Sequence, residues 1–205
     1  MRSIDSPLAK VLYVAGVTTF CTFLGCWAVL AHQETSQDPR KPAISDADFA
    51  KKAAQGGLAE VKLGHLAEQN GANDAVKQFG QRMVQDHIKA NDQLKQAAAK
   101  ENISLPGDLD PKDQAVYDAL AGLSGAAFDK VYARDMIRDH QQGVAEFNSE
   151  ANSGRKSAIK DFAEQTLPTL QDHLRQAREM RQTVLASSVE KTKATPSGKS
   201  GRGRR

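Results

Sequence analysis

The chain has 205 residues, of which 40% are hydrophobic, 26% charged and 5% aromatic, a composition that fits one soluble domain with tails. Its formal net charge of +3 comes from the C-terminal end: residues 187–205 carry six Lys and Arg against one acid, Glu190. The remaining residues carry nearly balanced charge, so they show no excess of positive charge that would indicate specific binding of nucleic acid. Both cysteines, Cys21 and Cys26, lie in an apolar N-terminal segment, which excludes a disulfide framework or a thiolate metal site elsewhere.

Residues 11–31 form a nearly continuous apolar segment preceded by Arg2 and Lys10. Its length is that of a membrane-spanning helix, whereas the small residues at its end are typical of a cleaved signal peptide. A third interpretation is a lipoprotein signal ending at Cys26. All three predict export to the periplasm or cell envelope, either free or anchored in the membrane by residues 1–31.

The next residues, 32–43, are polar with two prolines and are predicted to be a linker. Ser45, Asn73 and Ser124 stand where N-caps belong, each before a stretch of apolar residues at steps of three and four. These signals predict four long amphipathic helices, over residues 45–70, 73–100, 124–152 and 156–186. Asp110-Pro111 opens an additional short helix between the second and the third.

Four such helices with mostly short connections predict an all-α fold, an antiparallel four-helix bundle over residues 44–186. Gly56, Gly57 and Gly64 lie on the inward face of the first helix, where glycines suit either close approach of a neighbouring helix or room for a large group of a neighbour. We expect residues 187–205, rich in Ser, Lys, Gly and Arg, to be a disordered basic tail that touches anionic surfaces weakly.

On three of the predicted helices a histidine occupies the middle of the apolar, inward-facing side, and an aspartate precedes it each time: Asp86-His87, Asp139-His140 and Asp172-His173. An imidazole that leaves water needs partners for its nitrogens. Three of them at mid-helix positions predict one shared buried site, with Glu60 of the first helix nearby. Each preceding Asp points about 100° away around its helix, toward a boundary where it would orient a ring or pair with a cation.

Three imidazoles and one carboxylate form a suitable ligand set for one Zn, Fe or Mn ion. Met83 and Met136 lie one turn before His87 and His140, and their sulfur atoms would favour copper. The alternative is a metal-free polar network that fixes the register of the helices. In either case burial should hold the imidazoles neutral, except for one ring that pairs with Glu60 and gains a raised pKa.

Three sequence stretches resemble an uncharacterised bacterial envelope family labelled "predicted outer membrane protein", a ferritin-like domain of unknown function. They are Met83-Val84-Gln85-Asp86-His87, then Leu123-Ser124-Gly125 with Met136 and His140, and then Leu167-Pro168-Thr169-Leu170 with His173. The resemblance covers residues 44–180 and implies a four-helix bundle and an exported location. It implies no activity.

Ferritin-like di-iron proteins carry Glu three residues before each ligating His. In this chain Val84, Ile137 and Leu170 occupy those positions, so oxygen-activating chemistry is not indicated. No nucleophile triad, phosphate loop or inward pair of carboxylates is recognisable. The sequence therefore favours a non-enzymatic, exported binding or stress-related module with a buried His/Glu cluster. The alternative is a transition-metal-binding metalloprotein, and no protein partner is indicated.

Overall fold

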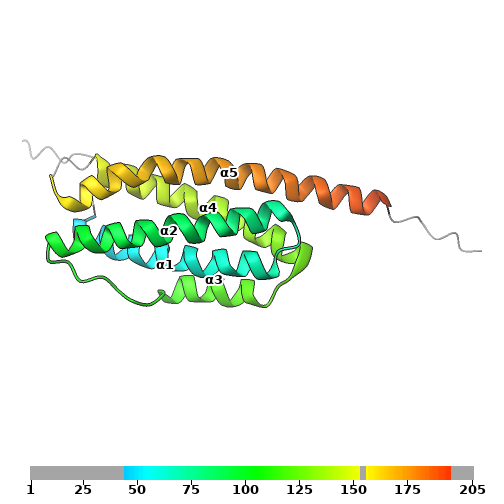
Figure 1. The fold of residues 1–205 in the computed structure, drawn as a ribbon, viewed down its shortest axis with the longest axis horizontal. Helices are drawn as coiled ribbons and strands as arrows, with labels where there is room; N and C mark the ends of the chain where they lie inside the picture. Colours follow the sequence, from blue (N-terminus) through cyan, green and yellow to red (C-terminus); the bar gives the residue numbers. More distant parts are fainter. Residues whose placement is uncertain (1–43, 153–155, 195–205) are drawn as a thin grey trace, which may run out of the picture. The chain divides into compact units, whose positions relative to one another are not determined.

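The structure, a computed structural model, describes residues 44–152 and 156–194, so the N-terminal apolar segment and the linker lie outside it. Those residues form five α-helices and no strand, which confirms the all-α class (Figure 1). The helices are α1 (Asp46–Asn70), α2 (Asp74–Lys100), α3 (Pro111–Ala121), α4 (Gly125–Ala151) and α5 (Ala158–Ala194). None of these helices is long and apolar enough to cross a membrane.

Side-chain caps fix where three of the helices begin. The Ser45 hydroxyl accepts the backbone N–H of Asp48, and the Asn73 side chain accepts that of Ala75. The Asp110 side chain accepts a hydrogen bond from the backbone N–H of Asp113 at the start of α3, and proline occupies the first position of this helix. Each cap satisfies one of the donors that a helix start leaves without an intrahelical partner, so the predicted boundaries are confirmed there.

The helices pack as two tightly paired sets, α1 with α2 and α4 with α5. The sets join through contacts of α2 with α5 and of α1 with α4, while the short α3 lies mainly against α1 (Figure 1). The predicted additional helix between the second and third long helices is therefore present, and it covers part of the first.

Two apolar clusters lie on either side of a polar layer. One contains Leu63, Val76, Phe79, Met83, Tyr132, Met136 and Met180 among others. The other contains Phe49, Leu94, Ile159 and Phe162 among others. On every long helix a buried polar residue separates the positions that belong to the two clusters: Glu60, His87, His140 and His173. The buried faces predicted from the sequence are thus confirmed, and the polar residue on each of them lies at the same level, between the two apolar clusters.

Two glycines bring the backbones of α1 and α2 into close contact. A Cβ atom built on Gly64 would lie 2.7 Å from the carbonyl oxygen of Gly80, and one built on Gly80 would lie 2.6 Å from the Cβ of Ala67. No side chain fits there without separating the helices. Of the three glycines expected to allow close approach or to leave room, Gly64 provides the close approach, with Gly80 as its partner. A Cβ atom on Gly57 would meet the side chain of Asn91, and one on Gly56 would meet nothing within 4 Å.

Helix α5 continues to Ala194, eight residues past the expected end at Ala186, so residues 187–194 are not part of a disordered tail. The Ser187 hydroxyl donates to the carbonyl of Thr183, and the Asn73 amide donates to Ser187. No glycine or proline interrupts the chain between Ala186 and Pro196, so nothing in the sequence stops the helix earlier. Residues 195–205 lie outside the described residues.

The glycine contact makes a matched pair of substitutions informative. Gly80→Ala should lower the free energy of unfolding by about 1–3 kcal/mol, because the added methyl group forces α1 and α2 apart. Gly56→Ala, on the same pair of helices, should raise it by about 0.5–1 kcal/mol, since an added Cβ would meet nothing within 4 Å and alanine favours helix. Urea denaturation measures both, and equal effects would show that the helices do not touch at Gly80.

Candidate metal-binding site

Three imidazoles from α2, α4 and α5 meet inside the helical domain. The ring centroids of His87 and His173 are 5.5 Å apart, those of His140 and His173 5.4 Å, and those of His87 and His140 6.0 Å. One nitrogen of each ring lies within 4.8 Å of one nitrogen of each other ring. All three side chains are buried. The convergence that the sequence predicted is confirmed.

Two of the rings have one nitrogen bound by an acceptor from outside the cluster. His140 Nδ1 lies 2.9 Å from the carbonyl oxygen of Met136, and His173 Nε2 lies 2.8 Å from Asp86 Oδ2. Because a carbonyl and a carboxylate only accept, these nitrogens carry the protons. The other nitrogens, Nε2 of His140 and Nδ1 of His173, therefore present lone pairs. Both are buried and lack a hydrogen-bond partner, as does Nε2 of His87.

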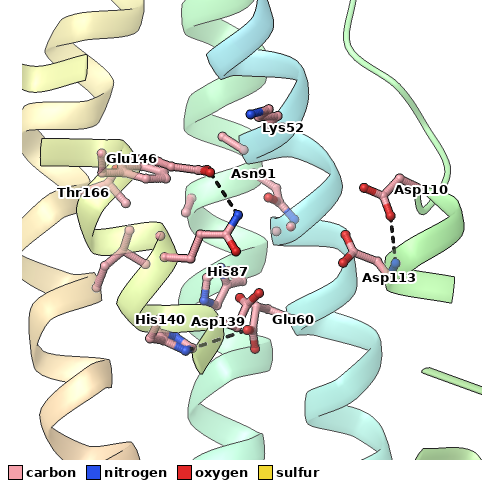
Figure 2. A pocket seen from close by; sticks show the side chains of 18 of the residues that line it. Lys52, Glu60, His87, Asn91, Asp110, Asp113, Asp139, His140, Glu146 and Thr166 are labelled. Carbon is pink, nitrogen blue, oxygen red and sulfur yellow. Dashed lines mark hydrogen bonds and ion pairs between the residues drawn. The ribbon is translucent and has the colours of Figure 1, made fainter. Parts of the chain in front are cut away.

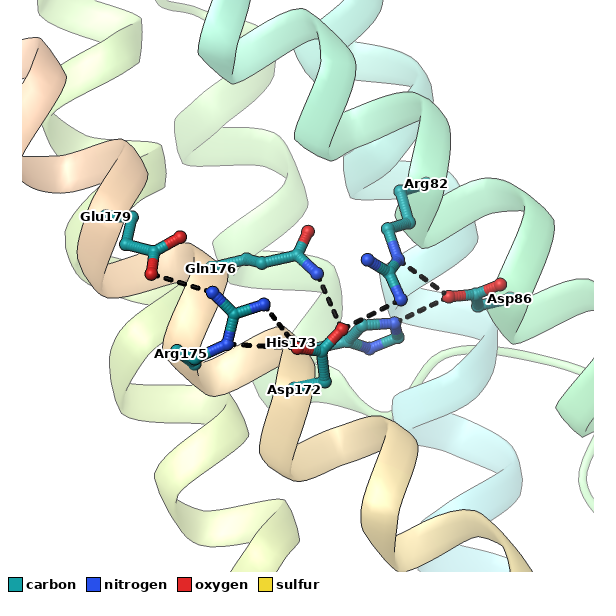
Figure 3. Close-up of polar contacts among 7 residues, drawn as sticks. All are labelled: Arg82, Asp86, Asp172, His173, Arg175, Gln176 and Glu179. Carbon is teal, nitrogen blue, oxygen red and sulfur yellow. Dashed lines mark hydrogen bonds and ion pairs between the residues drawn. The ribbon is translucent and has the colours of Figure 1, made fainter.

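A charged network on the outside of α2 and α5 holds Asp86 against His173 (Figure 3). Arg82 contacts Asp86 at 3.1 Å and Asp172 at 3.0 Å, and so connects the two helices. Asp172 also accepts from Arg175 and Gln176. The predicted roles of these two aspartates are confirmed: one orients the ring of another helix, and the other pairs with arginines.

Glu60 lies beside the imidazole cluster with 2% of its surface exposed. Its Oε1 is 3.8 Å from His140 Nδ1, and its oxygens accept no hydrogen bond from a nitrogen or hydroxyl group, whereas a proton shared with Asp139 would link the two carboxyl groups. Glu60, Asp139 and His140 form a second group whose potential ligand atoms lie within 4.8 Å of one another. Burial raises the pKa of Glu60 well above its usual value, and the nearby carboxyl of Asp139 raises it further.

Asp139 is the member of the site that sequence reasoning missed, since it expected no inward pair of carboxylates. Asp139 is half-buried and faces Glu60 across the α1–α4 contact. Its position one residue before His140 was the available signal. The rotation of α4 against α1 decides which way that side chain faces, and a single helix does not encode this rotation.

Burial lowers the pKa of all three imidazoles, and the neighbouring rings lower it further for His87 and His140. The pKa of His140 falls to about 4. At His173 the hydrogen bond and the negative charge of Asp86 raise the pKa and so partly offset the lowering caused by burial. The ring nearest Glu60 was expected to have a raised pKa, and that expectation is wrong: burial and the ring of His173 lower the pKa of His140 more than Asp139 and the Met136 carbonyl raise it.

A pocket of about 300 Å³ leads from the protein surface to the cluster (Figure 2). Glu60, Asp139, His87 and His140 line it, whereas His173 does not. Figure 2 shows the two carboxyl groups side by side next to His140, with His87 close behind. The site is therefore buried but accessible to a small ion.

The remaining residues considered from the sequence lie elsewhere. Met83 and Met136 are fully buried in the apolar cluster that contains Phe79 and Tyr132. His65, a fourth histidine of the described residues, is exposed, and its Nδ1 lies 3.7 Å from Glu68 Oε1.

Residues 31–180 match the model of a family described as "Domain of unknown function (DUF4142)", and the chain therefore belongs to this family. The expectation of an uncharacterised family is confirmed at that level, while the family description names no cellular location. No curated protein matches the sequence.

Two solved structures share the fold. A DUF305 protein from Streptomyces coelicolor, provisionally described as secreted, is 13% identical with a TM-score of 0.57, and the match covers 68% of this chain and 93% of that chain. A DUF305 fragment from Deinococcus radiodurans is 15% identical with a TM-score of 0.59, and the match covers 71% of this chain and 99% of that chain. At these identities the likeness concerns the fold alone.

The lowered imidazole pKa values predict acid sensitivity of the metal-free protein. Unfolded histidines titrate near ~6.5, so below that pH the unfolded state binds more protons than the folded state. Stability should be greatest above about pH 6.5 and fall as the pH drops toward 4, close to the folded pKa of His140. Glu60 acts in the opposite direction, because its raised pKa stabilises the folded state at low pH.

The measurement is the urea midpoint between pH 4.5 and 8 for the wild type, Glu60→Gln, and the triple variant His87→Gln, His140→Gln, His173→Gln. The loss on acidification should be steeper in Glu60→Gln and shallower in the triple variant. Identical pH dependence in the wild type and the triple variant would show that these imidazoles do not titrate with folding.

Proposed function

We propose that this protein is an exported, non-enzymatic module that binds one transition-metal ion through His87, His140 and His173. One observation carries the proposal: the three buried imidazoles each offer a nitrogen within 4.8 Å of the others, and each ring has one buried nitrogen without a hydrogen-bond partner. An unsatisfied buried polar atom costs about 1–3 kcal/mol, and a hydrogen-bonded network of the three rings would have avoided that cost. A metal ion accepts all three lone pairs at once.

The three imidazole ligands favour some metal ions over others. Three neutral imidazoles suit Zn²⁺, Cu²⁺ or Co²⁺ better than Mn²⁺, which prefers oxygen ligands. Zn–N bonds of about 2.0–2.1 Å in tetrahedral geometry place the nitrogens roughly 3.3 Å apart, so the rings need only approach each other by small side-chain rotations. The hydrogen bond from His173 to Asp86 is the usual arrangement by which a carboxylate orients a metal-binding imidazole.

The same proposal includes a ferritin-like four-helix bundle, supported by the two helix pairs and by a polar site at mid-height. The Glu-x-x-His pattern is missing, so we infer a single ion and no oxygen activation. Export is supported by the N-terminal apolar segment and by the DUF305 neighbour described as secreted. Whether that segment is cleaved or retained as an anchor is decided by the mass of the mature N-terminus.

Metal content tests the proposal directly. Untagged full-length protein should hold close to one equivalent of Zn²⁺ or Cu²⁺ by elemental analysis after equilibration and buffer exchange, and His140→Gln should hold much less. His65→Gln, which changes an exposed histidine outside the cluster, should match the wild type. A helical wild-type protein that retains no metal would leave the metal-free network as the function of the cluster.

The ring-orienting carboxylate gives a second prediction. Asp86→Asn should weaken metal binding by about 10–100-fold, since an amide no longer fixes the proton on Nε2 of His173. Asp172→Asn, which alters the same charged network without touching a ring nitrogen, should change the affinity far less. Competition titration with a chromophoric chelator measures both, and equal effects would mean that Asp86 acts only through the stability of the network.

A further inference from the structure

The pocket above the cluster has an uneven distribution of charge. Five carboxyl side chains line it: Glu60, Asp110, Asp113, Asp139 and Glu146. Two lysines, Lys52 and Lys112, stand against them. A cleft lined mainly by one sign of charge concentrates ions of the opposite sign and raises their rate of association.

Two carboxyl groups, those of Glu60 and Asp139, lie together in this pocket beside His140. Glu60 is almost completely buried, and neither of its oxygens accepts a hydrogen bond from a nitrogen or hydroxyl group. One oxygen atom of each carboxyl group and one nitrogen of His140 lie within 4.8 Å of one another, close enough for one divalent ion to contact both carboxyl groups. Carboxylate oxygens are suitable ligands for a divalent ion that still carries part of its hydration shell.

The geometry also orders these groups along a route. Glu60 lies on the Nδ1 side of His140, with Asp139 beside it, whereas the nitrogen of His140 that lacks a hydrogen-bond partner is Nε2. His87 and His140 line the pocket, and His173 lies beyond them. An ion that enters by the pocket therefore meets the carboxyl pair and two of the imidazoles before the third.

We propose that Glu60 and Asp139 form a transit site for a divalent cation, through which the ion passes from the pocket to the three imidazoles. This inference rests on the proposed metal-binding function and adds the route of entry to it. Glu60 then serves in loading the site and is not a fourth ligand of the bound ion.

The pocket wall offers a way to block the route without changing any charge. Gly143 of α4 lines the pocket, and a Cβ atom added at this position would meet nothing within 4 Å. A leucine here would fill part of the pocket while the helix remains intact, since leucine favours helix over glycine.

The test is stopped-flow binding of Co²⁺ to the full-length protein, followed by the visible absorption of the Co²⁺–imidazole complex. The variants are Glu60→Gln, Asp139→Asn, the double variant and Gly143→Leu, with the exposed Asp92→Asn as the charge-matched control. Circular dichroism and the final absorption spectrum verify that each variant folds and forms the same complex.

We expect the association rate constant of the double variant and of Gly143→Leu to fall tenfold or more relative to Asp92→Asn. The dissociation rate constant should fall as well, because the ion leaves by the route through which it entered. Association within threefold of the control in either variant overturns the transit site. Unchanged association with faster dissociation in Glu60→Gln would instead make Glu60 a ligand. If the wild type binds no Co²⁺ at all, the metal-binding function fails and the transit site with it.

Discussion

Removal of three imidazoles and a carboxyl group from water is the constraint on which the rest of this structure depends. Glu60, His87, His140 and His173 occupy a level of the helical domain where a buried polar residue interrupts the apolar face of each of the four long helices. Desolvation depresses the pKa values of the rings, so at neutral pH they are uncharged and their lone pairs are available. The same desolvation that makes the layer costly in the apo protein makes it a suitable ligand set for a metal ion.

Groups outside the polar layer determine which nitrogen of His140 and of His173 carries the proton and which keeps its lone pair. The carbonyl of Met136 and the carboxylate of Asp86 accept hydrogen bonds from the ring N–H groups of His140 and His173, and Arg82 holds Asp86 in place from a partly exposed position. The chemical character of the buried cluster is therefore set by a surface network between α2 and α5. The Asp-His pairs of the sequence contribute to it in different ways: Asp86 orients the ring of another helix, Asp172 binds arginines, and Asp139 joins Glu60 at the pocket.

Much of this arrangement could be predicted from the sequence because it depends on local rules. The spacing of Val76, Phe79, Met83 and His87 fixes one face of a helix, and caps such as Asn73 fix its start. Residues at the middle of long antiparallel helices must lie at similar heights, which is why the histidine cluster was predictable. The position of Asp139 was not, since it depends on how two helices are rotated against each other. Likewise the glycines of the first helix indicated either a close contact or room for a side chain, and only the packed structure shows that Gly64 makes the contact and that Gly80 is its partner.

The two apolar clusters on either side of the polar layer have a consequence for cooperativity. Each of the four long helices contributes side chains to both clusters, as Phe49 and Leu63 do for α1 and Leu94 and Val76 for α2. Because the same four helices build both clusters, the loss of one cluster weakens the support of the other. A change at the histidine level, midway between the clusters, therefore affects the packing on both sides of it.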